Sequence, residues 1–119
     1  MESGAPLQQL VATAYLPSTI AKLYGSPFAA NTPGVTVVTG FILANVTAGA
    51  VVASLSIVPP GGTQGMNNRI MPAVTIPANT SWFENEQEGI IVLPGGYELW
   101  GNSGGASSIT FTLYGREIP

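Results

Sequence analysis

The sequence of 119 residues contains no cysteine, no histidine and no aspartate. Without cysteine, the chain cannot form disulfide bonds, thiolate nucleophiles or cysteine-rich zinc sites. Without histidine it lacks the most common general base and zinc ligand, and without aspartate it lacks the acidic member of a Ser-His-Asp triad. Because most enzyme mechanisms depend on one of these residue types, we expect a protein that is not an enzyme and that binds no cofactor.

Charged residues are also scarce, at 8% of the chain against about 25% in typical soluble domains. The chain has three basic residues and a formal net charge of -3, so it is not expected to bind the phosphates of nucleic acid. A weakly charged surface is typical of a protein whose surface is covered by neighbours. We therefore expect protein partners. The N-terminus carries Glu2 and no basic segment, so it does not resemble a secretory signal.

The length of the chain corresponds to one domain with its own hydrophobic core. Residues 1–10 are expected to form a short flexible N-terminal arm, because Met1 to Pro6 are small and polar and show no periodicity. Residues 11–119 would then form the folded domain. Leu7 and Leu10 in this arm are candidates for contact with a neighbouring subunit.

The uncharged, largely apolar run from Val35 to Val58 has two possible interpretations. A run of this length could span a membrane as a helix, or it could form two buried strands joined by a turn at Asn45–Gly49. Its many Val, Ile and Thr residues favour strands, and no charged residue lies near its ends to anchor a membrane helix. We therefore predict that the run folds back on itself as two paired strands, with the membrane helix as the alternative.

The rest of the sequence predicts an all-β fold. Stretches of apolar and β-branched residues recur about every 8 to 12 residues between Gly, Pro and Asn-rich turns, which is typical of an antiparallel sandwich or jelly roll. We predict a single antiparallel β-sandwich, jelly-roll-like, with about eight strands. Residues 7–15 are predicted to form a strand or a short helix. Residues 69–77 are predicted to form an edge strand, because prolines lie within this segment and at its end. Residues 109–114 show the most regular alternation and are predicted to form a strand.

Glu84, Glu86 and Glu88 are the only concentration of charge in the sequence. On a strand their side chains would project from one face, where carboxylate oxygens could bind a hard cation such as calcium. The alternative is a solvated strand edge that repels unwanted pairing. We favour the edge, because no aspartate or glycine-rich metal loop accompanies the glutamates, and predict no metal site.

Four aromatic residues could stack on sugar rings or bases, namely Tyr97, Tyr114, Trp82 and Trp100. Aromatic side chains more often serve as core or interface anchors. We therefore place Trp82 and Trp100 among the interface candidates, together with Met66 in the glycine-rich loop Pro60–Asn68.

Two tripeptides match the acceptor pattern for N-glycosylation, beginning at Asn45 and at Asn79. Both asparagines lie at expected turns, where asparagine is favoured for its backbone geometry. The turn positions alone are sufficient to explain these asparagines, so the two matches are weak evidence for glycosylation.

Several motifs resemble small structural proteins of tailed-phage virions. They are ILANVTAGAVVASLSIVPPGG, which begins at Ile42, the strand end IPANTSW, the segment GIIVLPGGYELWG, and the closing strand ITFTLYGREI. The resemblance covers Gly34 to Ile118 and consists of strand order and turn placement. It implies a β-sandwich or jelly-roll module that acts as a head decoration (cement) protein, a head fibre, or a neck or tail component.

The resemblance implies a protein located in the virion that binds the major capsid protein or other virion proteins and stabilises the shell through these contacts. It also favours a homo-oligomer, and a trimer fits a cement protein best. The arm Met1–Leu10 or the loop Pro60–Asn68 is expected to make the contact between subunits. The alternatives are a neck, tail or fibre component, and a carbohydrate-binding β-sandwich at a receptor-binding tip in which Trp82 or Trp100 is exposed.

Overall fold

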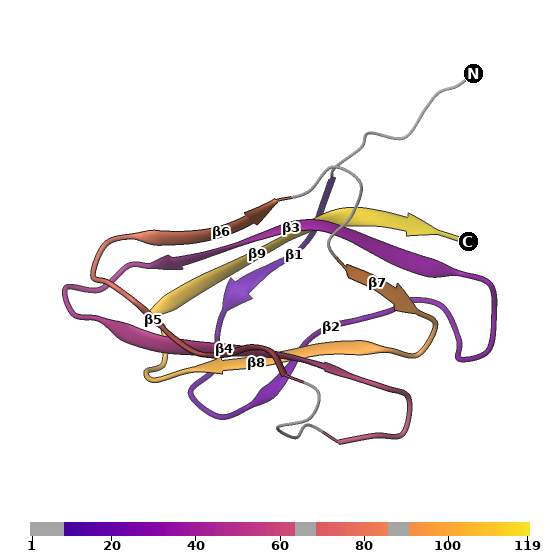
Figure 1. Ribbon diagram of the computed structural model, residues 1–119, viewed down its shortest axis with the longest axis horizontal. Coiled ribbons are helices and arrows are strands. Elements are labelled where there is room, and N and C mark those ends of the chain that lie inside the picture. Colours follow the sequence, from indigo (N-terminus) through magenta and orange to yellow (C-terminus); the bar gives the residue numbers. More distant parts are fainter. Residues whose placement is uncertain (1–8, 64–68, 86–90) are drawn as a thin grey trace.

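The computed structural model of the chain describes residues 9–63, 69–85 and 91–119 (Figure 1). These residues form strands and connections, with no helix among them. The strands are β1 (Gln9–Tyr15), β2 (Ala21–Gly25), β3 (Val35–Asn45), β4 (Val51–Val58), β5 (Arg69–Ile76), β6 (Ser81–Asn85), β7 (Ile91–Pro94), β8 (Glu98–Ser103) and β9 (Ile109–Ile118).

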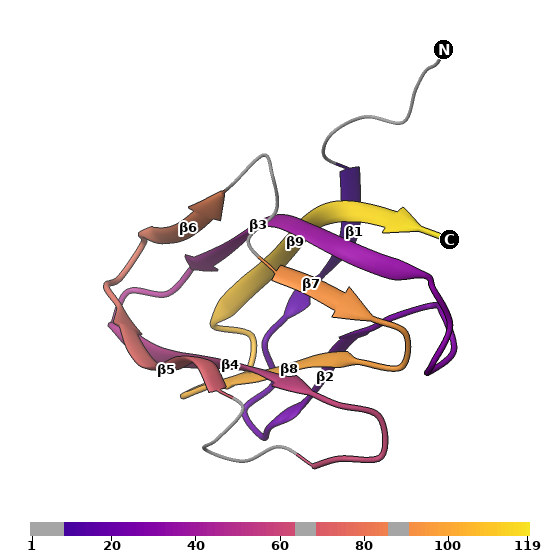
Figure 2. The same ribbon diagram turned by 45° about the vertical axis from the view of Figure 1, so that its right-hand side comes forward.

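The strands form two antiparallel sheets that pack face to face (Figures 1 and 2). The first sheet has the order β1-β9-β3-β6, with β7 also paired to β3, and the second sheet has the order β2-β8-β4-β5. The chain crosses between the sheets at almost every connection, and this alternation gives a jelly roll. The prediction of a jelly-roll-like antiparallel sandwich is confirmed.

The strands β6 and β7 share one edge of β3. Residues 81–85 pair with residues 40–44 of β3, and residues 91–94 pair with residues 35–38. The two strands therefore occupy one strand position in two pieces. The described residues thus contain nine strands in eight positions, which accounts for the difference from the predicted eight.

The central run forms two strands, as predicted, but the prediction that they pair with each other is wrong. The strand β3 lies between β9 and the pair β6 and β7, whereas β4 lies between β8 and β5 in the opposite sheet. The residues between them cross from one sheet to the other instead of closing a hairpin. Because β3 is central in its sheet and β4 is central in the other, both can be apolar over most of their length.

The side chain of Asn45 holds this crossing in place. Its carboxamide nitrogen donates to the carbonyl of Gly49, at 2.9 Å, and to that of Ile76, also at 2.9 Å. Its carboxamide oxygen accepts a hydrogen bond from the backbone N–H of Thr47 at 2.9 Å. Since Asn45 is only 2% exposed, these bonds replace those that water would otherwise make, and they direct the chain toward the second sheet.

The hydrophobic core lies between the two sheets. Its largest fully buried side chains come from strands of both sheets and include Leu43, Leu55, Leu93, Leu99, Ile109, Phe111 and Leu113. No segment in the described part of the chain forms a helix with the length and apolar character needed to cross a bilayer. At the N-terminal end, β1 is a strand and begins at Gln9, within the range expected for the arm.

Candidate interaction surface

The outer side of the first sheet is set by the alternation along β9. Ile109, Phe111 and Leu113 point into the core and are fully buried. Because successive side chains of a strand point to opposite faces, Tyr114 and Ile118 point away from the core. This alternation fixes which residues of the neighbouring strands face outward.

Residues that lie directly opposite each other in neighbouring strands share a face of the sheet. Leu10 lies opposite Tyr114, and Ile42 lies opposite Phe83. Val37 lies opposite Val92. We call the outward apolar residues of this sheet the outer apolar face; they are Leu10, Tyr15, Val37, Ile42, Phe83, Val92, Tyr114 and Ile118. Among them Val37 is buried although it points outward.

Several members of the outer apolar face are strongly exposed. Phe83 is 66% exposed, Val92 is 57% exposed and Leu10 is 56% exposed. They come from β6, β7 and β1, so the exposed apolar surface extends across the sheet rather than along one strand. Apolar surface spread over a whole face is typical of a site that binds another protein.

The outer apolar face carries little charge. Of the charged side chains that the structure describes, only Arg116 points outward from this sheet, opposite Val37. The Nε atom of Arg116 is buried and has no hydrogen-bond partner within the described residues. Since few charges would have to lose water, covering this face with a neighbour has a low desolvation cost.

Trp100 lies on the opposite side of the molecule. It pairs with Lys22 and Ser56 on the outer side of the second sheet. Its indole N–H donates to Glu98 Oε1 at 2.8 Å, and the other carboxylate oxygen of Glu98 lies 3.7 Å from the Lys22 ammonium group. These contacts hold the half-buried indole ring in one orientation.

The structure does not bring the predicted interface residues together. Leu10 belongs to the outer apolar face, whereas Trp82 lies opposite the buried Leu43, on the core-facing side of the edge strand β6. Trp100 is on the other sheet. Leu7 and Met66 lie outside the described residues. Val92 precedes the buried Leu93, whereas Phe83 follows the exposed Trp82. The sequence therefore contains only a weak signal for the outer apolar face, which can be recognised once the strand pairing is known.

The glutamate cluster is only partly within the described residues. The backbone of Glu84 in β6 pairs with that of Phe41 in β3. Glu86 and Glu88 lie outside the described residues. Elsewhere in the described part of the chain, no three His, Cys, Asp or Glu side chains come close enough together to hold a metal ion.

The two matches to the glycosylation pattern differ in accessibility. The carboxamide of Asn45 is buried and donates both of its hydrogen bonds to backbone carbonyls. Asn79 is exposed at a turn with a positive φ of 54°, a conformation that asparagine tolerates better than most residues. Asn45 therefore has a structural function that a glycan would disrupt.

Tyr24 links the two sheets through its hydroxyl group, a contact that the sequence did not indicate. The hydroxyl donates to Glu117 Oε2 in β9 at 2.5 Å and lies 2.8 Å from Thr36 Oγ1 in β3. Burial, together with the hydrogen bond to Glu117, raises the pKa of Tyr24 from 10.0 to about 12. The hydroxyl therefore keeps its proton, and its hydrogen bond to Glu117, to a higher pH than an exposed tyrosine would.

Comparison with known proteins gives no match, either to a family model or to a curated protein sequence. The function of the chain is therefore inferred from the chemistry of its surfaces.

Proposed function

We propose that the chain is a structural protein of a tailed-phage virion, and that it acts as a capsid decoration (cement) protein. In this proposal the outer apolar face binds the major capsid protein or another virion protein. The contact adds buried surface across the shell and raises the free energy needed to separate its subunits.

The observation that supports this proposal most directly is the exposure of Phe83, Val92 and Leu10 on one face of the sandwich. A typical protein interface buries about 800 Å² on each partner, out of 6150 Å² that the chain exposes. One face of the sandwich is large enough for such a contact. Each buried Å² of apolar surface contributes about 25 cal/mol before the costs of association are subtracted.

Two further observations support an assembly function. The chain has only 8% charged residues, so its surface is poor in the charge that keeps a free monomer soluble. Arg116 points outward among apolar residues with its Nε atom unpaired within the described residues, and a carbonyl or carboxylate on a neighbour would satisfy it.

The jelly roll itself does not distinguish between functions, because viral capsid proteins and lectins share it. The exposed apolar residues of the outer apolar face favour contact with a protein over contact with a soluble sugar. The resemblance to virion proteins between Gly34 and Ile118 agrees with this choice. A neck, tail or fibre component would use the same face against a different partner.

Binding to shells tests the proposal. The purified chain is mixed with virions assembled without it, and the particles are sedimented. We expect the chain to pellet with the particles up to a fixed stoichiometry and to raise the temperature at which the shells disrupt. A chain that remains in the supernatant at all concentrations would contradict the decoration function. Mass measurement of the free chain tests the predicted trimer separately.

A further inference from the structure

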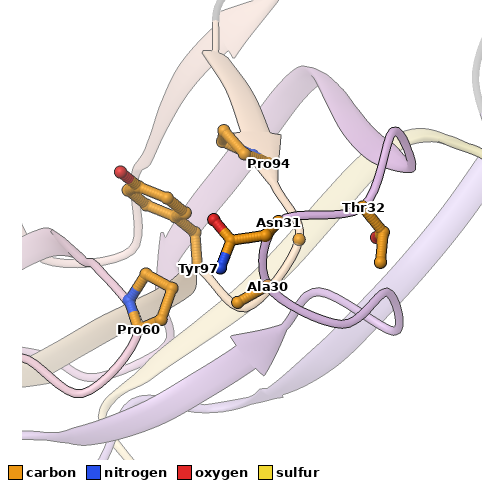
Figure 3. A pocket seen from close by; sticks show the side chains of 7 residues that line it. Ala30, Asn31, Thr32, Pro60, Pro94 and Tyr97 are labelled. Atoms are coloured by element: carbon orange, nitrogen blue, oxygen red, sulfur yellow. The ribbon is translucent and has the colours of Figure 1, made fainter.

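A cavity of about 350 Å³ lies at one end of the sandwich. Three parts of the chain that are far apart in sequence form its walls, as Figure 3 shows. They are the connection between β2 and β3, the segment after β4, and the turn between β7 and β8; the lining residues are Ala30, Asn31, Thr32, Pro60, Pro94, Gly95 and Tyr97.

Backbone contacts hold the walls of this cavity together. The N–H of Gly96 donates to the carbonyl of Phe28 at 2.9 Å, and the N–H of Ser26 donates to the carbonyl of Tyr97 at 2.9 Å. A Cβ atom on Gly95 would lie 2.0 Å from the carbonyl oxygen of Ala29. Because only glycine permits this close approach, the turn and the connection pack directly against each other and the cavity is already formed without a ligand.

The lining of the cavity combines apolar surfaces with uncharged polar groups. The ring of Tyr97 and the rings of Pro60 and Pro94 supply the apolar surfaces, and the carboxamide of Asn31 is turned toward Tyr97 (Figure 3). Within the described residues, neither this carboxamide nor the Tyr97 hydroxyl has a hydrogen-bond partner. No lining residue is charged.

We propose that this cavity binds a single neutral sugar ring, a hexose or an N-acetylhexosamine. The C–H face of a pyranose packs on an aromatic ring such as that of Tyr97. A sugar hydroxyl both donates and accepts hydrogen bonds, and the carboxamide of Asn31 offers both a donor and an acceptor to match it. The absence of charge in the lining excludes strong selection for phosphates, acidic sugars or amino acids.

The size and lining of the cavity favour a sugar over a peptide. At about 350 Å³ the cavity is near the lower limit for small-ligand sites, which range from about 300 to 1,000 Å³. Proline-rich peptides dock as extended helices on grooves lined by several aromatic residues, whereas the described lining of this cavity has one aromatic residue, Tyr97. None of the described residues that line the cavity is a member of the outer apolar face, so the proposal does not depend on the virion function.

An NMR titration of the isotope-labelled full chain with glucose, galactose, mannose and N-acetylglucosamine tests this proposal. We expect saturable shifts of the backbone amides of Asn31, Gly95 and Gly96 at millimolar concentrations of at least one sugar, without shifts on the outer apolar face. The absence of saturable shifts with all four sugars would overturn it. So would shifts at these amides with a proline-rich peptide alone.

Two variants and a matched control test which groups bind the sugar. Asn31→Gly removes the carboxamide and accepts the positive φ of 65° at this position. Tyr97→Ala removes the stacking surface. We expect each variant to weaken binding at least tenfold. Asn79→Gly makes the same change at the exposed turn with φ 54° and should leave the affinity unchanged. Equal affinity in all three variants would overturn the proposed site.

Discussion

Tyr24 on β2 and Glu117 on β9 are joined by a hydrogen bond of 2.5 Å, although they are separated by 93 positions in the sequence and belong to different sheets. The bond ties the C-terminal end of the last strand to the second sheet. Together with the contact between Tyr24 and Thr36, it forms a polar link between the two layers of the sandwich.

Replacing Tyr24 with phenylalanine should destabilise the fold. Tyr24→Phe removes the hydroxyl while keeping the buried ring, and it leaves Thr36 without this partner. Since Glu117 is exposed and solvent weakens its contribution, we expect a loss of about 1 kcal/mol in the free energy of unfolding. Urea denaturation measures the change. Tyr15→Phe, at an exposed tyrosine, is the control and should leave the stability unchanged; equal stability of both variants would contradict the proposed link.

The same hydroxyl predicts a loss of stability at high pH. The pKa of Tyr24 is raised from 10.0 to about 12 in the folded state, so folding favours its protonated form. Its contribution is therefore complete below pH 10 and is lost as the pH rises from 10 to 12. Denaturation curves at several pH values over this range should show a steeper loss for the wild type than for Tyr24→Phe. Parallel curves would show that Tyr24 does not cause the loss.

Because Asn45 holds the crossing between β3 and β4, we expect its substitution to destabilise the fold. Asn45→Asp keeps the oxygen that accepts from Thr47 but replaces the nitrogen that donates to the carbonyls of Gly49 and Ile76. A buried carboxylate would then face two carbonyl oxygens, and we expect a loss of about 2 to 4 kcal/mol. Thermal unfolding measures this loss. Asn79→Asp, at the exposed turn, is the matched control, and a similar loss there would contradict the account of the crossing.

The local patterns of the sequence predicted the strands well. In β9 the alternation of Ile109, Phe111 and Leu113 identified the core-facing side, and all three are fully buried. The prolines near residues 69–77 predicted an edge strand, and β5 lies at the edge of the second sheet. These features depend on neighbouring residues and on the period of two along a strand, so the sequence alone is sufficient to predict them.

Features that depend on distant parts of the chain were not predictable in this way. The assignment of β3 and β4 to opposite sheets follows from pairing with strands far along the chain, and the bond from Asn45 at the end of β3 reaches Ile76, which lies 31 residues away. The cavity at Tyr97 requires the approach of Gly95 to Ala29 across two separate connections. The outer apolar face exists only because the strand pairing places Phe83 and Val92 on the same side as Leu10.

The most direct test of the proposed function compares shell binding by two variants, one with a charge on the outer apolar face and one with a charge on the outer side of the second sheet. Val92 and Val52 are both exposed strand valines, at 57% and 41%; Val92 lies on the outer apolar face and Val52 on the second sheet. A buried unpaired carboxylate would disrupt an interface. We therefore expect Val92→Glu to reduce sedimentation with shells at least tenfold and Val52→Glu to bind as the wild type does. Wild-type binding by Val92→Glu would contradict the account.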